Sequence, residues 1–303
     1  MSAQTRTVSV ILTYYNRADT LADAARSVLE QTHSDLTLYL VNDGSTDESR
    51  KVAGELDDPR IEHIDLLRNL GVAKARNVGI DSAHTTLVAF MDSDDIWLPR
   101  KLEIQLSCLR DAQLADSKIA VAGCGWRIHE SALKPREFSY GPYSRIDVLH
   151  DRVAGLRTPM LIVDRSVAAK DARFDESLPA LLDRDYVMSC LANDTEVVVV
   201  PEVLSLVRRG RADHVASSRR VATAYEMLTR KYAPELARFP ELRTWYSFRA
   251  AREHLIHRDV RQALGHAPTA LGDERAKRSV HLMLGVLGGR KGLAMAQKIC
   301  QLN

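Results

Sequence analysis

Three carboxylates end an apolar run in the first third of the chain, where Asp92, Asp94 and Asp95 follow Phe90 and Met91. Because neighbouring negative charges repel one another, a hard divalent cation would relieve their electrostatic cost. At the carboxyl end of a parallel strand, the three side chains would point into the crevice where open α/β sheets bind ligands. The segment therefore predicts a site for Mn²⁺ or Mg²⁺ that bridges protein oxygens and a diphosphate. A turn or helix cap built from Asp and Ser is the alternative.

A second acidic turn lies upstream, where Asn42, Asp43, Gly44 and Ser45 follow another apolar run. Asp43 is suited to accept hydrogen bonds from a nucleobase imide or a ribose hydroxyl. Gly44 permits a tight turn, and Ser45 is a candidate cap for the helix that follows. A plain turn explains the same string equally well, so this segment is weak evidence by itself.

The elements that must position these turns follow from hydrophobic patterning. Apolar residues at helical spacing predict an amphipathic helix from Leu21 to Leu29 with its N-cap at Asp19. Capping-box spacing from Ser45 to Glu48 predicts another helix directly after Gly44. Right-handed crossovers between the intervening strands then give a mostly parallel sheet. The β-branched runs that predict these strands are residues 8–13, 36–42, 61–66 and 86–91.

The second half of the chain continues with strands and then changes to helices. Pro99 is placed to begin a helix, and later runs rich in Val, Ile and Leu predict strands over residues 118–129, 160–163 and 196–206. Residues 130–157 are loop-like and are expected to cover a site. After Ser218 only helical patterns remain. We therefore predict a catalytic domain over residues 1–218, with a donor half to about 115 and an acceptor half from about 116, and a helical region over 219–303.

Composition limits the class of protein. The chain of 303 residues is 45% hydrophobic and 27% charged, as in ordinary globular proteins. No apolar run approaches the roughly 18–20 residues of a membrane-spanning helix, and the start lacks a signal-peptide pattern, so we expect a cytoplasmic location. The four cysteines are far apart, which favours buried free thiols over a zinc site or disulfides.

Charge is distributed unevenly along the chain. Residues 1–218 contain 26 Lys and Arg against 33 Asp and Glu, whereas residues 219–303 contain 16 against 7. The basic C-terminal region is suited to peripheral contact with the anionic inner face of a membrane, or with an acidic acceptor. A charged face on solvated helices is the alternative.

Taken together and in order, five segments resemble glycosyltransferase family 2. The resemblance covers roughly residues 7–218, and its segments are residues 8–17, 27–32, 42–47, 69–80 and 92–101. It implies an α/β fold of the GT-A type, the Rossmann-like fold of nucleotide-diphospho-sugar transferases, with a mostly parallel sheet flanked by helices. It also implies a nucleotide-sugar donor, with a UDP-sugar expected, a divalent metal and inversion at the anomeric carbon. The chain departs from the family at Thr13, which replaces a proline, at Tyr14, which replaces a threonine, and at Asn42, which replaces an acid.

Roles for individual residues follow from this resemblance. Tyr15 and Asp43 are expected to hold the base, Asp92 the ribose, and Asp94 the metal. Lys74 is expected to neutralise donor oxygens, a solvated helix lysine being the alternative. The expected nucleotide-sugar site comprises Thr13, Tyr15, Asp43, Lys74, Asp92 and Ser93.

The acceptor-side motif gives a candidate general base. Phe174 to Leu178, followed by Asp183, Arg184 and Asp185, resemble this motif. Arg184 replaces its usual glutamate. Asp185 is the expected base, because an acceptor hydroxyl needs its proton removed as it attacks. Asp183 is held in reserve, and a helix N-cap is the alternative role for Asp185. Arg208, Arg209, Arg211 and His214 are further candidates for closing over the diphosphate.

The expected acceptor is a glycan, a lipid-linked sugar or a protein, in surface glycan or polysaccharide biosynthesis, with no nucleic-acid partner.

Two other functions compete with this interpretation. A nucleotidyltransferase of similar fold would show a Gly-rich loop after the first strand, and residues 13–17 contain no glycine. A non-catalytic nucleotide-sugar-binding protein is the second alternative, since fold alone does not establish catalysis.

Overall fold

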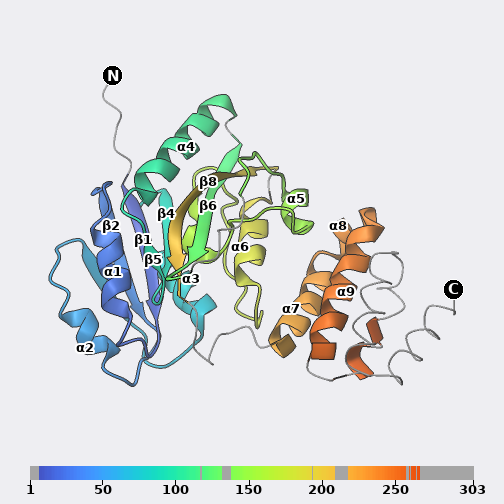
Figure 1. The fold of residues 1–303 in the computed structure, drawn as a ribbon, viewed down its shortest axis with the longest axis horizontal. Coiled ribbons are helices and arrows are strands. Elements are labelled where there is room, and N and C mark those ends of the chain that lie inside the picture. Colours follow the sequence, from blue (N-terminus) through green and yellow to red (C-terminus); the bar gives the residue numbers. More distant parts are fainter. Residues whose placement is uncertain are drawn as a thin grey trace. The chain divides into compact units, whose positions relative to one another are not determined.

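The computed structural model describes residues 7–116, 118–131, 138–192, 194–208, 218–256, 259, 261–263 and 265–266. The chain divides into two compact units, which are drawn in Figure 1. The first unit comprises residues 1–176 and 182–210, and the second comprises residues 177–181 and 211–303. The division thus falls after Gly210, eight residues before the boundary expected from the loss of strand patterns at Ser218.

An eight-stranded sheet forms the centre of the first unit, with strand order β3-β2-β1-β4-β7-β6-β8-β5. The pairs β1–β2, β1–β4, β2–β3 and β6–β8 are parallel, and β4–β7, β6–β7 and β5–β8 are antiparallel. The sheet is therefore mostly parallel, as predicted. The strands are β1 (Val8–Tyr14), β2 (Leu36–Asn42), β3 (Ile61–Asp65), β4 (Leu87–Asp92), β5 (Ile96–Trp97), β6 (Ile119–Ile128), β7 (Ile162–Asp164) and β8 (Glu196–Val207).

Helices cover both faces of the sheet. Since successive strand residues point to opposite sides, neighbouring residues of one strand pack against different helices. Val10 of β1 belongs to a core cluster with residues of α1 and α4, whereas the next residue, Ile11, faces α3. A Cβ at Gly79 of α3 would lie 2.4 Å from Ile11 Cγ2, so glycine permits this close packing. The helices of this unit are α1 (Leu21–Leu29), α2 (Ser49–Gly54), α3 (Val72–Ser82), α4 (Lys101–Ala115), α5 (Arg145–Leu149) and α6 (Leu182–Cys190), with a 3₁₀ turn at Thr158–Met160.

The register of the parallel strands places the polar turns at one edge. Tyr14 pairs with Asn42, and Thr13 pairs with Asp92 on the other side of β1. The chain therefore leaves β2 and β4 at the same end of the sheet, with β1 between them. The two acidic turns therefore lie at the same edge of the sheet, on strands separated by β1.

The starts of α1 and α2 differ from the sequence predictions. The N-cap of α1 is Thr20 rather than Asp19. Helix α2 begins at Ser49 instead of directly after Gly44. Ser45 Oγ accepts a hydrogen bond from the backbone N–H of Asn16 at 3.1 Å, so it does not cap α2.

Two other differences concern the segment that precedes β7. Residues 145–149 form α5 within the stretch expected to be a loop, and a capping box between Ser144 and Asp147 begins it. Met160 lies in the 3₁₀ turn, so that β7 starts at Ile162. The short length of both elements explains why hydrophobic periodicity did not show them.

The second unit is helical in its described part, as predicted, with α7 (Ser218–Lys231), α8 (Ala233–Arg238) and α9 (Pro240–Ile256). Tyr225 of α7 and Tyr246 of α9 pack edge to face, with ring centroids 5.6 Å apart. No helix among the described residues has the length and apolar character needed to cross a membrane. Cys108, Cys124 and Cys190 are free thiols. Cys124 and Cys190 are buried, as predicted, whereas Cys108 is partly exposed, and Cys300 lies outside the described residues.

Candidate functional site

Asp43 fixes the turn after β2. Its two carboxylate oxygens accept hydrogen bonds from the backbone N–H groups of Leu70 and Gly71, at 2.7 and 2.9 Å. Gly44 adopts φ +68, and a Cβ there would lie 2.3 Å from the carbonyl carbon of Arg68. Burial raises the pKa of Asp43, although the two backbone hydrogen bonds oppose this shift. Asp43 thus ties the end of β2 to the loop that enters α3.

The replacement of a family acid by Asn42 has a structural explanation. The Asn42 amide Nδ2 donates to Asp65 Oδ1 at 2.8 Å, and its Oδ1 accepts from the backbone N–H of Ser45 at 2.9 Å. A carboxylate at position 42 would face the carboxylate of Asp65 without a proton to donate. An amide satisfies both neighbours because it carries a donor and an acceptor.

Asp92 has a buried cationic partner, Arg76. The Arg76 guanidinium donates to Asp92 Oδ1 at 2.6 Å, is itself 6% exposed, and lies over the Phe174 ring. Sequence reasoning assigned no role to Arg76. Its spacing from Ala73 and Ile80 places it on the buried face of α3, and that spacing was the available signal.

Asp94 and Asp95 follow directly, in different environments. Asp94 is partly exposed, and its Oδ2 lies 3.9 Å from Arg17 Nε. Asp95 is 4% exposed and accepts a hydrogen bond from the backbone N–H of Arg208 at 3.2 Å. Burial, followed by the charges of Asp92 and Asp94, raises the pKa of Asp95 to about 8. Burial and the two neighbouring carboxylates of this acidic cluster thus favour the protonated form of Asp95.

We predict that this cluster makes stability depend on pH when metal is chelated. The pKa of Asp95 is about 8 in the folded state against 3.8 for an ordinary Asp, so the folded protein retains a proton that the unfolded chain loses. The free energy of unfolding should therefore fall as pH rises between about 4 and 8, by at most about 1.4 kcal/mol per pH unit. Urea unfolding in EDTA at pH 5 and pH 8 measures this change.

Asp95→Asn should flatten that pH dependence, because an amide does not titrate. The control Asp57→Asn alters an exposed acid and should retain the wild-type slope. Equal slopes for wild type and Asp95→Asn would show that Asp95 ionises normally.

The donor set at this edge fits a divalent cation. Carboxylate oxygens are ligands that Mg²⁺ and Mn²⁺ prefer, and Asp94 is the partly exposed member of the cluster beside a buried acid with a raised pKa. A cation at Asp94 would stabilise the ionised form of Asp95. The geometry is therefore consistent with the metal role expected for Asp94.

The remaining expected donor contacts differ in exposure. Tyr15 is 39% exposed beyond the end of β1, whereas Thr13 and Ser93 are buried. Lys74 Nζ lies 3.2 Å from Glu176 Oε1. The hydrogen bond from Asn77 and the one from Lys74 lower the pKa of Glu176, so the lysine has an anionic partner within the protein. Lys74 can reach a donor oxygen only by sharing or leaving this pair.

Asp183 and Asp185 both lie in the first turn of α6, and burial distinguishes them. Asp185 is 0% exposed, whereas Asp183 is partly exposed and its Oδ1 accepts from the backbone N–H of Arg184 at 2.8 Å. The guanidinium of Arg184 pairs with Asp151. The solvent-accessible carboxylate of this turn is therefore Asp183.

An aromatic cluster attaches α6 to β4. The Tyr186 and Phe174 rings stack with centroids 4.1 Å apart, and both meet Phe90 edge to face at 5.2 and 5.3 Å. Phe90 precedes Asp92 by two residues, and Tyr186 follows Asp185. The cluster thus brings the first turn of α6 to the strand that carries the acidic turn.

The arginine-rich segment after β8 is described only at its start. The Arg208 guanidinium pairs with Asp23 Oδ2 at 2.8 Å. Arg209, Arg211 and His214 lie outside the described residues. Closure of these side chains over a diphosphate therefore stays a prediction.

Solved structures share this architecture. TarS from S. aureus matches with a TM-score of 0.65 and 15% identity over 96% of this chain and 55% of TarS. The mannosyltransferase PcManGT from Pyrobaculum calidifontis, solved with GDP-Man and Mn²⁺, matches with a TM-score of 0.60 and 15% identity over 97% of this chain and 84% of PcManGT. These likenesses identify the class: the chain has the GT-A glycosyltransferase fold.

The chain belongs to glycosyltransferase family 2, because the model of Glycosyl transferase family 2 matches residues 9–169, more than half of its length. The succinoglycan biosynthesis protein ExoO of Rhizobium meliloti is 29% identical over 95% of this chain and 87% of ExoO. The putative teichuronic acid biosynthesis glycosyltransferase TuaG of Bacillus subtilis is 34% identical over 51% of this chain and 61% of TuaG. The family and fold expected from the sequence motifs are thus confirmed.

Proposed function

We propose that this protein is an inverting, metal-dependent glycosyltransferase that moves a sugar from a UDP-sugar to an acceptor hydroxyl. The observation that carries this proposal is the meeting of two acidic turns, after β2 and after β4, at one edge of the parallel strands. Ligands bind at this edge in open α/β sheets. The carboxylate oxygens of Asp92, Asp94 and Asp95 are ligands of the kind that a hard divalent cation prefers.

Donor binding is divided among the turns. We assign the base to Tyr15 and Asp43, with Thr13 beside them, and the ribose to Asp92 with Ser93. The Arg76 hydrogen bond holds the Asp92 carboxylate in place while leaving its second oxygen as an acceptor. Asp94 would hold a divalent metal, which would supply Lewis-acid stabilisation of the departing diphosphate. Lys74 is assigned to donor oxygens in exchange for Glu176.

We assign the general base to Asp183 rather than Asp185. A base must come within hydrogen-bond reach of the acceptor hydroxyl, and Asp183 is the accessible carboxylate of α6. The acceptor oxygen forms a bond to the anomeric carbon as the bond from that carbon to the diphosphate breaks. The hydroxyl proton passes to the carboxylate of Asp183. One such displacement inverts the anomeric configuration.

The acceptor class is suggested by relatives of known or named role. WfgD of Escherichia coli, 38% identical over 34% of this chain and 40% of WfgD, is named a UDP-Glc:α-D-GlcNAc-diphosphoundecaprenol β-1,3-glucosyltransferase. The chain spans less than two thirds of WfgD and of TuaG. We propose a lipid-linked sugar or growing glycan as the acceptor, in the biosynthesis of a surface polysaccharide.

A panel of nucleotide sugars tests the donor assignment. Melting temperatures with each donor, with and without Mn²⁺, should rise most for the cognate donor in the presence of metal. Release of UDP on turnover supports sugar transfer. Release of pyrophosphate would instead indicate a nucleotidyltransferase, and donor binding without turnover on any acceptor would indicate a binding protein.

We also propose that the second unit contacts an anionic membrane at its inner face. Arg219, Arg220, Arg230 and Lys231 are exposed on α7. The second pair follows the first by eleven residues, which is about three helical turns. Arg249 does not belong to this surface, because its guanidinium lies over the rings of Tyr225 and Trp245.

Each basic residue near an anionic bilayer contributes about 1 kcal/mol, so four suffice for reversible docking. We expect the protein to sediment with anionic vesicles at low salt and to be released as salt rises. Reversing the charges of Arg219, Arg220 and Arg230 should abolish sedimentation without changing the melting temperature. Absence of wild-type binding at low salt would contradict this proposal.

A further inference from the structure

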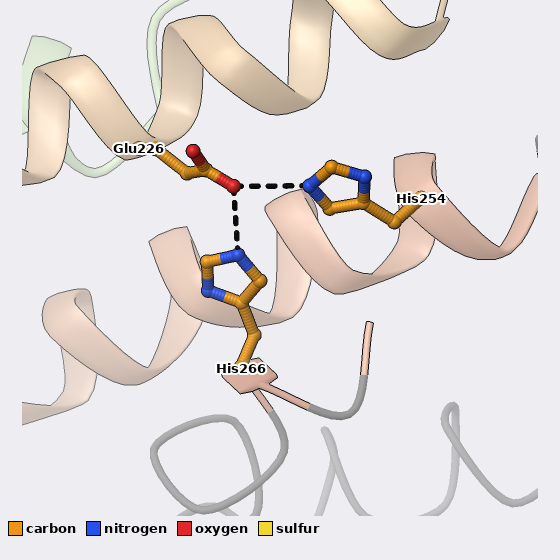
Figure 2. A group of neighbouring side chains, drawn as sticks. All are labelled: Glu226, His254 and His266. Atoms are coloured by element: carbon orange, nitrogen blue, oxygen red, sulfur yellow. Dashed lines mark hydrogen bonds and ion pairs between the residues drawn. The ribbon is translucent and has the colours of Figure 1, made fainter. Parts of the chain in front are cut away.

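Three side chains of the second unit meet at one point that the glycosyltransferase site does not use. Figure 2 shows Glu226 of α7 facing His254 of α9 and His266 of the helical residues that follow. The Nε2 atoms of His254 and His266 lie 3.0 and 2.9 Å from the same carboxylate oxygen, Glu226 Oε1. One atom from each residue lies within 4.8 Å of the other two.

The two imidazoles share one oxygen of the carboxylate. Both imidazoles approach Oε1, and neither contacts the second oxygen of the carboxylate (Figure 2). The rings lie nearly parallel, with centroids 5.7 Å apart and planes 13° apart. The Nε2 atoms of the two histidines and Oε1 of Glu226 are therefore three potential ligand atoms that face a common centre.

Burial shields this centre from bulk water. His254 is 7% exposed, and Glu226 and His266 are partly exposed. The other ring nitrogen of His254, Nδ1, is buried without a hydrogen-bond partner among the described residues. Burial would raise the pKa of Glu226, but the hydrogen bonds from the two histidines outweigh it, so the pKa falls below its usual range. The carboxylate is therefore anionic, as a metal ligand must be.

The spacing suits a small tetrahedral cation. Zinc binds histidine nitrogen and carboxylate oxygen at about 2.0–2.2 Å, which places neighbouring ligand atoms about 3.3 Å apart. The two distances to Glu226 Oε1 need to lengthen by only a few tenths of an ångström, and the two nitrogens would lie about as far from each other. Two imidazoles favour Zn²⁺ over the hard cations Mg²⁺ and Mn²⁺, which prefer oxygen.

We propose that Glu226, His254 and His266 form a Zn²⁺ site in the helical second unit. Three protein ligands leave a fourth position for water or an exogenous ligand. The ligands come from α7, from α9 and from the residues beyond α9, so bound zinc would join these three segments. This site differs in residues and in metal preference from the acidic turn after β4.

The full-length chain with Asp94→Asn provides the test, because that background lacks the proposed donor-metal ligand. Stripped of metal and titrated with Zn²⁺ by calorimetry, it should bind one equivalent tightly and gain melting temperature. Co²⁺ in place of zinc should give the visible absorption of four-coordinate nitrogen and oxygen ligation. Mn²⁺ should neither bind tightly nor raise the melting temperature.

Loss of one ligand should weaken zinc affinity at least about 100-fold, since even outer-shell substitutions at metal sites cost 10- to 100-fold. Glu226→Gln, His254→Gln and His266→Gln test the three ligands. The matched controls Glu241→Gln and His63→Gln change exposed residues of the same types and should bind zinc as the parent does. Circular dichroism checks folding, and the partly exposed His266 decides the outcome if His254→Gln unfolds.

Two results would overturn the proposal. One is a parent protein that binds no zinc at near-stoichiometric concentration. The other is zinc affinity that survives in a folded His266→Gln or Glu226→Gln variant, which would place the metal elsewhere. In either case, Glu226, His254 and His266 would be a hydrogen-bonded cluster that does not bind zinc.

Discussion

Replacing Asp183 with Asn should lower the rate of sugar transfer by roughly 10²- to 10⁴-fold, the range expected for loss of a general base. Donor affinity should be unchanged, because Asp183 lies in α6 and not among the turns that we propose to bind the donor. The Asp183 carboxylate is partly exposed, so its replacement by an isosteric amide should leave the melting temperature near the wild-type value. Single-turnover kinetics and donor calorimetry measure the two effects separately.

Asp185→Asn is the matched comparison, two residues away in the same turn. Asp185 is 0% exposed, so an amide there disturbs buried interactions and should lower the free energy of unfolding by about 1–3 kcal/mol. Its rate per folded molecule should stay close to that of wild type. The opposite ranking, a folded Asp185→Asn variant with little turnover beside an active Asp183→Asn variant, would return the base to Asp185.

Replacing Asp94 with Asn should weaken Mn²⁺-dependent donor binding by at least about 100-fold, because a metal contact to the diphosphate contributes several kcal/mol. Stability should hold or rise in the absence of metal. The substitution removes one of the charges that raise the pKa of Asp95, so it relieves repulsion in the cluster. Calorimetry with UDP and with UDP-sugars, in Mn²⁺ and in EDTA, measures this effect.

Asp111→Asn serves as the control for Asp94→Asn, since Asp111 is an exposed acid of α4. It should retain the wild-type dependence on Mn²⁺. If Asp94→Asn also retained that dependence, the metal would have to be held by other residues, and Asp92 and Asp95 would be the next to test.

Strands β1 to β4 could be predicted almost to the residue because their signal is local, whereas the two-residue strand β5 was not predicted. Every residue of β1 is buried, and such strands appear in the sequence as continuous β-branched runs. The helix starts could not be predicted as well. Ser45 bonds to Asn16 from another turn, and Asp47 accepts from the backbone N–H of Ala18, so contacts distant in sequence replaced the local capping box.

The same limit applies to the candidate site. The acidic turns were visible because their spacing is local, but the pairing of Arg76 with Asp92 depends on how α3 packs against β4. The ranking of Asp183 and Asp185 depends on which side of α6 is covered, and the motif alone did not show it. Glu226, His254 and His266 are separated by up to 40 residues, with no motif to connect them.

The pairing of β7 with β4 has a consequence for synthesis on the ribosome. Strands β1 to β4 can pair as they emerge, but the outer edge of β4 is covered only when Leu87, Val88 and Ala89 pair with β7, which ends at Asp164. At 5–20 residues per second, the roughly 70 residues between Asp92 and Asp164 take about 4–14 seconds to translate. During that interval the nascent chain carries an apolar strand with an open edge, the kind of surface that pairs with other chains. A slow stretch of translation between these strands would lengthen the exposure, and a chaperone bound there would shorten it.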